Sequence, residues 1–143
     1  MLLRELTHGP IVTCSPEEPI SAVARSMERE RVGSVVVVEV HGDVVGIVTD
    51  RDLALEGLGH ELDPETPVEA IMSRGVVTID STADIFDAAE LMAKARCRRL
   101  PVVDEHGYPI GVVTFDDLML LLTRQADDLA HTVATESLRP IQV

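Results

Sequence analysis

The chain has 143 residues, of which 45% are hydrophobic and 26% are charged, a composition typical of a compact soluble domain. Its 12 Lys and Arg residues stand against 25 Asp and Glu residues, which gives a formal net charge of −13. A field of that sign repels phosphate backbones and anionic lipid headgroups, which argues against wholesale binding to nucleic acid or membrane surfaces.

Two copies of one pattern fill most of the chain. Leu3 to Leu58 aligns with Val68 to Thr123 at a constant offset of 65 residues without a gap, and 16 of the 56 aligned pairs are identical. A unit of about 55 residues buries too little surface to be stable alone, so we expect the copies to share a core. A solenoid needs three or more repeats. The duplication therefore predicts a pseudo-twofold pair.

Within each copy, the spacing of apolar residues predicts a short helix followed by strand, helix, strand, strand and helix. In the helix that begins at Pro19, the residues Ile20, Val23 and Met27 recur at helical spacing, and Glu28 to Arg31 form its solvated end. A His-Gly-Asp turn joins the two β-branched runs that follow, as in a hairpin. The predicted segments are Leu3 to Thr7, Ile11 to Cys14, Pro19 to Arg31, Val35 to Val40, Val44 to Thr49 and Asp50 to Leu58.

The second copy repeats this order. Its predicted segments are Val68 to Met72, Val76 to Ile79, Asp84 to Ala95, Leu100 to Asp104, Pro109 to Thr114 and a helix from Phe115. Two β-α-β-β-α units make an α/β (α+β) fold of two small sheets with helices on their outer faces. The predicted domains are residues 1–60 and 68–124, with a linker at 61–67 and a C-terminal helix and tail at 125–143.

The last helix runs past the end of its counterpart in the first copy. An apolar stripe follows it at helical spacing, through Leu118, Leu121, Leu122, Gln125, Leu129 and Val133. Because the repeat offers this stripe no partner, it either packs back on the body or meets another subunit.

The cysteines and histidines are interpreted as structural residues. Cys14 aligns with aliphatic Ile79, and Cys97 aligns with aliphatic Val32, so we expect both thiols to act as small buried hydrophobes. The five histidines include a pair in equivalent turns, and none lies at metal-ligand spacing with Cys, Asp or Glu. No metal site is predicted.

Sequence patterns of enzymes, secreted proteins and membrane proteins do not occur in this chain. It has no paired nucleophile and base and no Walker-type loop, so we do not expect an enzyme. The first residues lack the apolar core of a signal peptide, and runs such as Val35 to Val38 are far too short to span a bilayer. We therefore expect a cytoplasmic protein.

Both copies end their last strand in the same motif, a glycine, two apolar residues, a threonine and an aspartate three residues later. The motif positions are Gly46, Thr49 and Asp52 in the first copy and Gly111, Thr114 and Asp117 in the second. One interpretation is a capping box, in which the threonine and the aspartate cap a helix start. The other is a ligand site, in which the helix start faces a phosphate, the carboxylate holds ribose hydroxyls and the glycine lets the ligand approach.

This doubled pattern of strand-helix-strand-strand-helix with Gly-x-x-Thr-x-x-Asp resembles a tandem pair of CBS domains (named for cystathionine β-synthase), also called a Bateman module. The resemblance covers Leu3 to Arg124. It implies a cleft that binds AMP, ADP, ATP, S-adenosylmethionine or NAD, with no required cofactor, and modules that dimerise into a flat disc. It also implies that Asp52 and Asp117 hold ribose hydroxyls, with Thr49 and Thr114 beside the phosphate or ribose.

Basic residues precede the middle strand in the second copy, where the first copy has Val32-Gly33-Ser34: they are Arg96, Arg98 and Arg99. If the motif of one half faces this segment of the other, as the resemblance implies, the Asp52 site receives Arg98 and Arg99, with Arg51 as a further candidate. We then expect a phosphorylated ligand at Asp52 and a weaker or neutral adenosine ligand at Asp117. The alternative is that these arginines pair with surface acids.

An apolar slot for adenine is expected from Val12, Val36 and Val77, with backbone groups near Thr13 and Thr78 reading the base edge. The leading hypothesis is therefore a regulatory module that senses an adenosine compound. The alternative is an interaction or scaffold module with vestigial sites, whose acidic surface and last helix dock onto an unknown protein.

Overall fold

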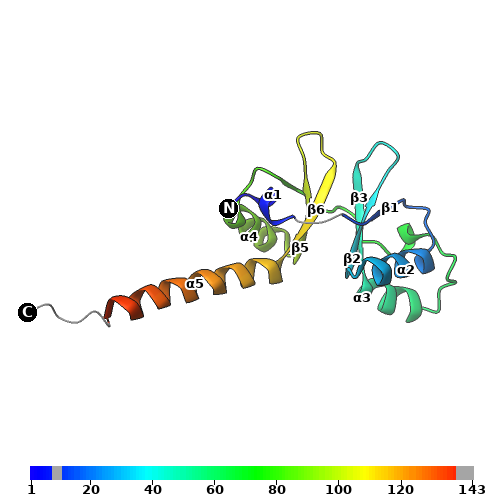
Figure 1. Cartoon of the computed structure of the whole chain (residues 1–143). Helices are drawn as coiled ribbons and strands as arrows, with labels where there is room; N and C mark the ends of the chain where they lie inside the picture. Colours follow the sequence, from blue (N-terminus) through cyan, green and yellow to red (C-terminus); the bar gives the residue numbers. More distant parts are fainter. Residues whose placement is uncertain (8–10, 138–143) are drawn as a thin grey trace, which may run out of the picture.

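The computed structural model describes residues 1–7 and 11–137, and the two repeats form two separate three-stranded sheets (Figure 1). The first repeat contains α1 (Leu3–Leu6), β1 (Thr13–Cys14), α2 (Ile20–Glu30), β2 (Ser34–Val38), β3 (Val44–Thr49), α3 (Asp50–Asp52) and η1 (Leu53–Leu58). The second contains η2 (Val68–Ala70), β4 (Ile79–Asp80), α4 (Ile85–Ala95), β5 (Arg99–Val103), β6 (Pro109–Thr114) and α5 (Phe115–Ser137). The predicted order of elements and the mixed α/β class are confirmed.

The two sheets have the same topology. In the first, β1 pairs parallel with β2 and β2 pairs antiparallel with β3, in the order β1-β2-β3. The second has the order β4-β5-β6 with the same directions, and both hairpins carry a register shift at equivalent places, Val37/Val38 and Val102/Val103. The three central residues of each middle strand, β2 and β5, are buried, as expected for a strand that is covered on both faces, whereas β3 and β6 are only partly buried.

The buried side chains form two hydrophobic clusters, one in each repeat, rather than the single shared core that we expected. The first centres on Val35, Val37 and Val48, and the second on Leu100, Val102 and Val113. Each cluster lies between the sheet and the longer helices of one repeat and also includes residues of a short segment from the other repeat. Burial of these aliphatic side chains is the main favourable term in the stability of each half.

What joins the halves is an exchange of the short segments that precede them. Leu3 of α1 is fully buried in the cluster of the second repeat, where its N–H donates to the carbonyl of Ala83 at 2.9 Å. Val68 of η2 is fully buried in the cluster of the first repeat, where its N–H donates to the carbonyl of Glu18 at 2.8 Å. Neither half completes its core without residues that adjoin the other in sequence.

The motif glycines are where these exchanged segments approach most closely. A Cβ added to Gly46 would collide with the Met72 side chain, and one added to Gly111 would collide with Thr7. We expected these glycines to make room for a ligand. The atoms closest to the glycines belong instead to the exchanged segments of the chain itself. In the first repeat, Ser73 of such a segment pairs with Ile47, the residue after Gly46.

The helix that follows β3 differs from the one predicted at Asp50 to Leu58. Only α3 is α-helical, and η1 continues it as a π-helix that ends with the N–H of Gly59 donating to the carbonyl of Ala54 at 2.9 Å. Gly57 of η1 is buried against Ile20 of α2, so the wider turn brings a residue without a side chain to a crowded contact.

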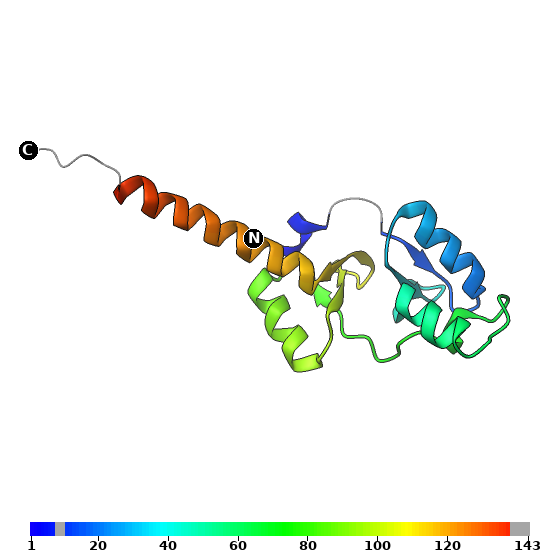
Figure 2. The same ribbon diagram turned by 90° about the horizontal axis from the view of Figure 1, so that it is seen from below.

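The last helix, α5, extends away from the body of the molecule, as Figure 1 and the perpendicular view in Figure 2 both show. Its first turns are anchored, since Leu118 is buried and Leu121 packs against the second cluster. Leu129 and Val133 are 69% and 64% exposed. Of the two expectations for this apolar stripe, packing back on the body holds only for its beginning. Within residues 1–7 and 11–137, we find no helix with the length and apolarity that crossing a membrane requires.

Candidate functional site

Both Thr-x-x-Asp motifs form reciprocal capping boxes at the starts of α3 and α5. The N–H of Thr49 donates to Asp52 Oδ2 at 2.9 Å, and the N–H of Asp52 donates to Thr49 Oγ1 at 3.1 Å. Thr114 and Asp117 make the same two hydrogen bonds at the same two distances. The structural interpretation of the motif is therefore confirmed, and each aspartate satisfies an N–H at a helix start.

The caps leave half of each carboxylate free. Both aspartates accept through Oδ2, and no hydrogen bond to Oδ1 of Asp52 or Asp117 occurs among the described residues. A carboxylate oxygen can accept more than one hydrogen bond, so the cap does not exhaust the side chain. Capping a helix and contacting a ligand are compatible roles for these residues.

Asp117 faces a cavity of about 460 Å³ between the two repeats, which we call the Asp117 cavity. Its volume lies in the range of small-molecule sites. It is lined by residues of the N-terminal segment and of both repeats: Leu6, Thr7, Ile11, Val12, Arg31, Val32, Gly33, Ser34, Arg99, Ile110, Gly111, Val112, Thr114 and Asp117. Threonine, aspartate and two arginines therefore surround one space.

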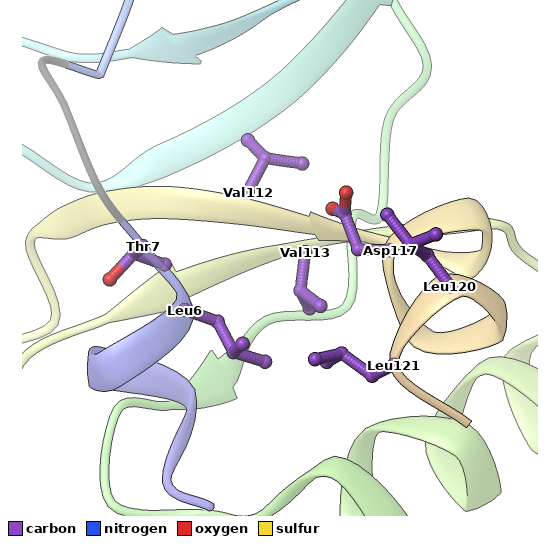
Figure 3. Close-up of a pocket in the computed structure, with 7 residues that line it drawn as sticks. All are labelled: Leu6, Thr7, Val112, Val113, Asp117, Leu120 and Leu121. Carbon is purple, nitrogen blue, oxygen red and sulfur yellow. The ribbon is translucent and has the colours of Figure 1, made fainter. Parts of the chain in front are cut away.

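A smaller hollow of about 180 Å³ lies on the other side of Asp117, and Figure 3 shows its lining. The side chains of Leu6 and Leu121 point toward each other there, while the Asp117 carboxylate points away from both, toward the first repeat. Asp117 thus sits at the edge between an apolar hollow and the larger, polar cavity.

The repeat places a second cavity, of about 410 Å³, at the first motif, and we call it the Thr49 cavity. It is lined by Ile47, Thr49, Ser73, Arg74, Gly75, Val76, Val77, Ala95, Cys97, Arg98 and Arg99. Thr49, Val77 and Ile47 occupy the positions that Thr114, Val12 and Val112 hold in the Asp117 cavity. The lining does not include Asp52 among the described residues.

The arginines predicted for the first motif are brought to it, but they are not equivalent. Arg99 is half-buried, lines both cavities and makes no salt bridge within residues 1–7 and 11–137. Arg98 lines the Thr49 cavity, yet its Nη2 lies 3.3 Å from Asp116 Oδ1 and its guanidinium stacks 4.6 Å from the Phe115 ring centre. The alternative of pairing with a surface acid is therefore observed for Arg98.

Some predicted site residues lie elsewhere. Arg51 is exposed on α3 and lines neither cavity among the described residues. Thr13 and Thr78 are likewise outside both linings, although their neighbours Val12 and Val77 are inside. Val36, expected in the adenine slot, is 0% exposed and is not available to a ligand. It lies in the middle strand of the first sheet, paired with β1 on one side and β3 on the other.

Two cavity arginines were not predicted. Arg31 lines the Asp117 cavity from the end of α2, and Arg74 lines the Thr49 cavity, where its Nη2 donates to the carbonyl of Glu69 at 3.1 Å. For Arg31 the sequence held one signal, because Arg31 and Arg96 are identical at the repeat offset. In the structure both residues adopt a left-handed conformation, which favours glycine. Arg74 has no such signal.

The two thiols lie in different surroundings. Burial raises the pKa of the Cys14 thiol to about 12, and the Glu18 carboxylate acts in the same direction. Cys14 is 7% exposed and belongs to the first cluster, which confirms its prediction as a buried hydrophobe. Cys97 is half-buried and lines the Thr49 cavity. In the part of the chain that the structure describes, no group of three or more His, Cys, Asp or Glu residues could hold a metal ion.

Comparison with known families and proteins identifies this arrangement. The model of the CBS domain family matches residues 3–59 and 68–124, which are the two repeats. The uncharacterized protein MK0525 of Methanopyrus kandleri is 34% identical over 116 residues, 80% of this chain, and the match spans 59% of that protein's length. The CBS domain-containing protein YhcV of Bacillus subtilis is 38% identical over 108 residues, 76% of each chain.

Solved structures match the whole pair of repeats. The CBS domain pair of protein MJ0100, in complex with 5′-methylthioadenosine and S-adenosylmethionine, superposes with a TM-score of 0.76 at 26% identity, over 87% of this chain and 98% of that chain. The CBS domain protein PAE2072 of Pyrobaculum aerophilum, in complex with AMP, gives a TM-score of 0.75 at 26% identity, over 87% of this chain and 99% of that chain.

Proposed function

The chain belongs to the CBS domain family, and on that premise we propose that it is a regulatory module that binds an adenosine-containing ligand in the cavities between its repeats. The solved relatives bind AMP, S-adenosylmethionine and 5′-methylthioadenosine, which supports this ligand class. The supporting observation in this chain is the pair of cavities at equivalent positions, each bordered by a motif threonine and by arginine.

The two motif carboxylates bind the ribose. Each keeps Oδ1 free after capping its helix, and an ionised carboxylate accepts hydrogen bonds from the hydroxyls of a ribose. Asp117 lines its cavity directly. Asp52 stands one turn beyond Thr49 and reaches the ligand from the rim of the Thr49 cavity.

The Thr49 cavity takes the more phosphorylated ligand. Three arginines line it, namely Arg74, Arg98 and Arg99, whereas the Asp117 cavity has Arg31 and Arg99. Asp116 offsets the charge of Arg98, but among the described residues Arg74 and Arg99 have no carboxylate beside them in this lining, whereas Asp117 lines the other cavity. In a chain with a net charge of −13, this arrangement forms a local positive field that attracts a phosphate. The Asp117 cavity binds an adenosine compound with fewer phosphates.

Regulation follows from the position of the cavities. A ligand that contacts both repeats favours the relative orientation in which its contacts are best, and this orientation is what a partner protein can sense. The inosine-5′-monophosphate dehydrogenase of Thermoplasma acidophilum matches this chain over only 22% of the enzyme's own length, so most of the enzyme has no counterpart in the matched region. We therefore propose regulation rather than catalysis as the role of this chain.

A thermal-shift panel tests the proposal. The chain is heated alone and with AMP, ADP, ATP, S-adenosylmethionine or NAD, and at least one of these is expected to raise Tm in a concentration-dependent way, because a ligand of the folded state stabilises it by mass action. Adenosine, which has no phosphate, and inorganic phosphate alone serve as controls. They show whether the nucleoside part or the phosphate part of the ligand is sufficient to raise Tm. If no compound raises Tm, the module is better explained as an interaction or scaffold protein.

A further inference from the structure

Arg99 is the residue that the two ligand cavities share. It is half-buried and lines both the Asp117 cavity and the Thr49 cavity. Among the described residues, no other residue occurs in both linings, and no carboxylate forms an ion pair with Arg99. One guanidinium charge is therefore accessible to ligands in two places.

The strand register explains why Arg99 borders both cavities. At the start of β5, Arg99 is paired with Thr114 across the antiparallel ladder, so the two side chains lie on the same face of the second sheet. The equivalent pair in the first sheet is Ser34 with Thr49. Ser34 lines the Asp117 cavity, whereas Thr49 lines the other cavity. The start of each middle strand therefore lies where the two cavities meet.

The duplication does not supply a second shared charge. The counterpart of Arg99 at the repeat offset is Ser34, which is neutral. The remaining arginines of the site each line one cavity, Arg31 that of Asp117 and both Arg74 and Arg98 that of Thr49. In the part of the chain that the structure describes, two equivalent cavities thus have one cation in common.

We propose that the two cavities compete for Arg99, so that a phosphorylated ligand in one cavity weakens the binding of a phosphorylated ligand in the other. This inference rests on the proposed function, because it takes both cavities to be sites for adenosine compounds. A bidentate contact directs the guanidinium fork at one phosphate, and two phosphates near one side chain repel each other. Thermodynamic linkage makes the effect equal in both directions.

The competition gives the module a preference for two different ligands. When Arg99 turns to a phosphate in the Thr49 cavity, Arg74 and Arg98 are also present there, but the Asp117 cavity keeps only Arg31 among its described arginines. A neutral adenosine compound needs no cation and is not affected. Full occupancy therefore favours a phosphorylated compound beside Thr49 together with a neutral one beside Asp117.

Calorimetric titration of the full chain with AMP tests the competition. The native chain gives the product of the two stepwise association constants, and the variants Asp117→Asn and Asp52→Asn give the constant of each cavity by itself. Independent cavities make the native product equal to the product of the two single constants. We expect the native product to be about tenfold lower with AMP. With adenosine the two products should be about equal.

Two further variants identify the residue responsible, each titrated alone and combined with Asp52→Asn or Asp117→Asn. In Arg99→Gln the two products for AMP should become about equal. The matched control is Arg74→Gln, which removes an arginine from the Thr49 cavity alone; it should weaken AMP binding there and keep the tenfold deficit.

The results separate this inference from the function on which it rests. A deficit that persists in Arg99→Gln would assign the competition to repulsion between the phosphates and overturn the role of Arg99. Independent or mutually favourable binding of AMP to the native chain, or AMP binding in one cavity alone, also overturns the competition while leaving a ligand-binding module. Binding of none of the five adenosine compounds would instead refute the proposed function itself.

Discussion

Arg31 and Arg96 end equivalent helices in the same left-handed conformation, with φ of 55° and 53°, but only Arg31 lines the Asp117 cavity. A non-glycine residue in this conformation costs roughly 1 kcal/mol relative to glycine. The arginine at position 31 therefore lowers stability but places a positive charge in the cavity that Asp117 also lines. The duplication supplies a matched control, because Arg96 carries the same backbone cost outside both ligand cavities.

Arg31→Gly and Arg96→Gly are expected to have the same effect on stability, but only Arg31→Gly should weaken ligand binding. Each variant should raise stability by about 1 kcal/mol, or Tm by about 4 °C, because glycine relieves the left-handed strain. Arg31→Gly should weaken AMP binding in the Asp117 cavity by about tenfold through the loss of a charge-assisted hydrogen bond. Calorimetry in an Asp52→Asn background isolates this cavity. Equal affinities of the two variants would remove Arg31 from the site.

Arg99→Gln tests how the site distinguishes phosphorylated ligands from adenosine. The Arg99 side chain lines both cavities and has no ion-pair partner among the described residues, so its charge is available to a phosphate. The variant should lose about tenfold in affinity for AMP and little for adenosine. Competition binding of the two compounds gives the ratio. The comparison variant Arg98→Gln should change it less, since Asp116 already holds the Arg98 guanidinium. An unchanged AMP-to-adenosine ratio in Arg99→Gln would contradict this role.

The exchange of segments between the repeats predicts an energetic coupling between Gly46 and Met72. Gly46→Ala should destabilise the chain by about 1–3 kcal/mol, because the added methyl group collides with the Met72 side chain. In a Met72→Ala background the same change should cost less, since the obstructing thioether is gone. Urea unfolding of the four chains of this double-mutant cycle measures the coupling. Strict additivity would mean that the two residues do not touch in solution.

The two thiols should differ sharply in reactivity. With its pKa raised to about 12 by burial, the Cys14 thiol stays protonated at pH 8 and is shielded from reagents, whereas Cys97 is half-buried at a cavity wall. Titration with a thiol reagent should label one group per chain in buffer and two in urea. The Cys97→Val variant, which retains only Cys14, should give no rapid labelling in buffer. Rapid labelling of that variant would contradict the burial of Cys14.

The duplicated pattern was sufficient to predict the order of elements and the class of fold. Each repeat contains apolar runs at strand and helix spacing, and agreement between the copies made each assignment more secure. The strands β1 and β4 are shorter than predicted, because only two residues of each pair with the middle strand, and Val12 and Val77 turn to cavity walls instead. Neither the π-helical form of η1 nor the division into two cores could be read from local patterns.

The candidate site was predictable in part. The capping boxes follow from the Thr-x-x-Asp spacing alone, and the approach of Arg98 and Arg99 to Thr49 came from the family resemblance. Local sequence does not say which sheet a short apolar segment covers, so the exchange of Leu3 and Val68 between repeats was not foreseen. For the same reason, it was not foreseen that Met72 would fill the space beside Gly46, whereas Gly111 has Thr7 close to it and still lines the Asp117 cavity.

The two roles of the motif aspartates can be separated by substitution. Asparagine retains an oxygen that can accept from the threonine N–H, so it preserves the cap, but it replaces the free Oδ1 with an amide donor. Asp52→Asn and Asp117→Asn should therefore change stability little. Alanine at the same positions removes the cap and should cost about 1 kcal/mol at each. Thermal unfolding of these four variants establishes which of them are suitable for binding experiments.

The most direct measurement is calorimetric titration of the native chain and of the Asp52→Asn, Asp117→Asn double variant with AMP, ADP, ATP, S-adenosylmethionine and NAD. We predict saturable binding of at least one compound to the native chain and at least a tenfold loss of affinity in the double variant at unchanged Tm. Binding of none of the five compounds, or equal affinity in the two proteins, would contradict the proposal that these carboxylates hold an adenosine ligand between the repeats.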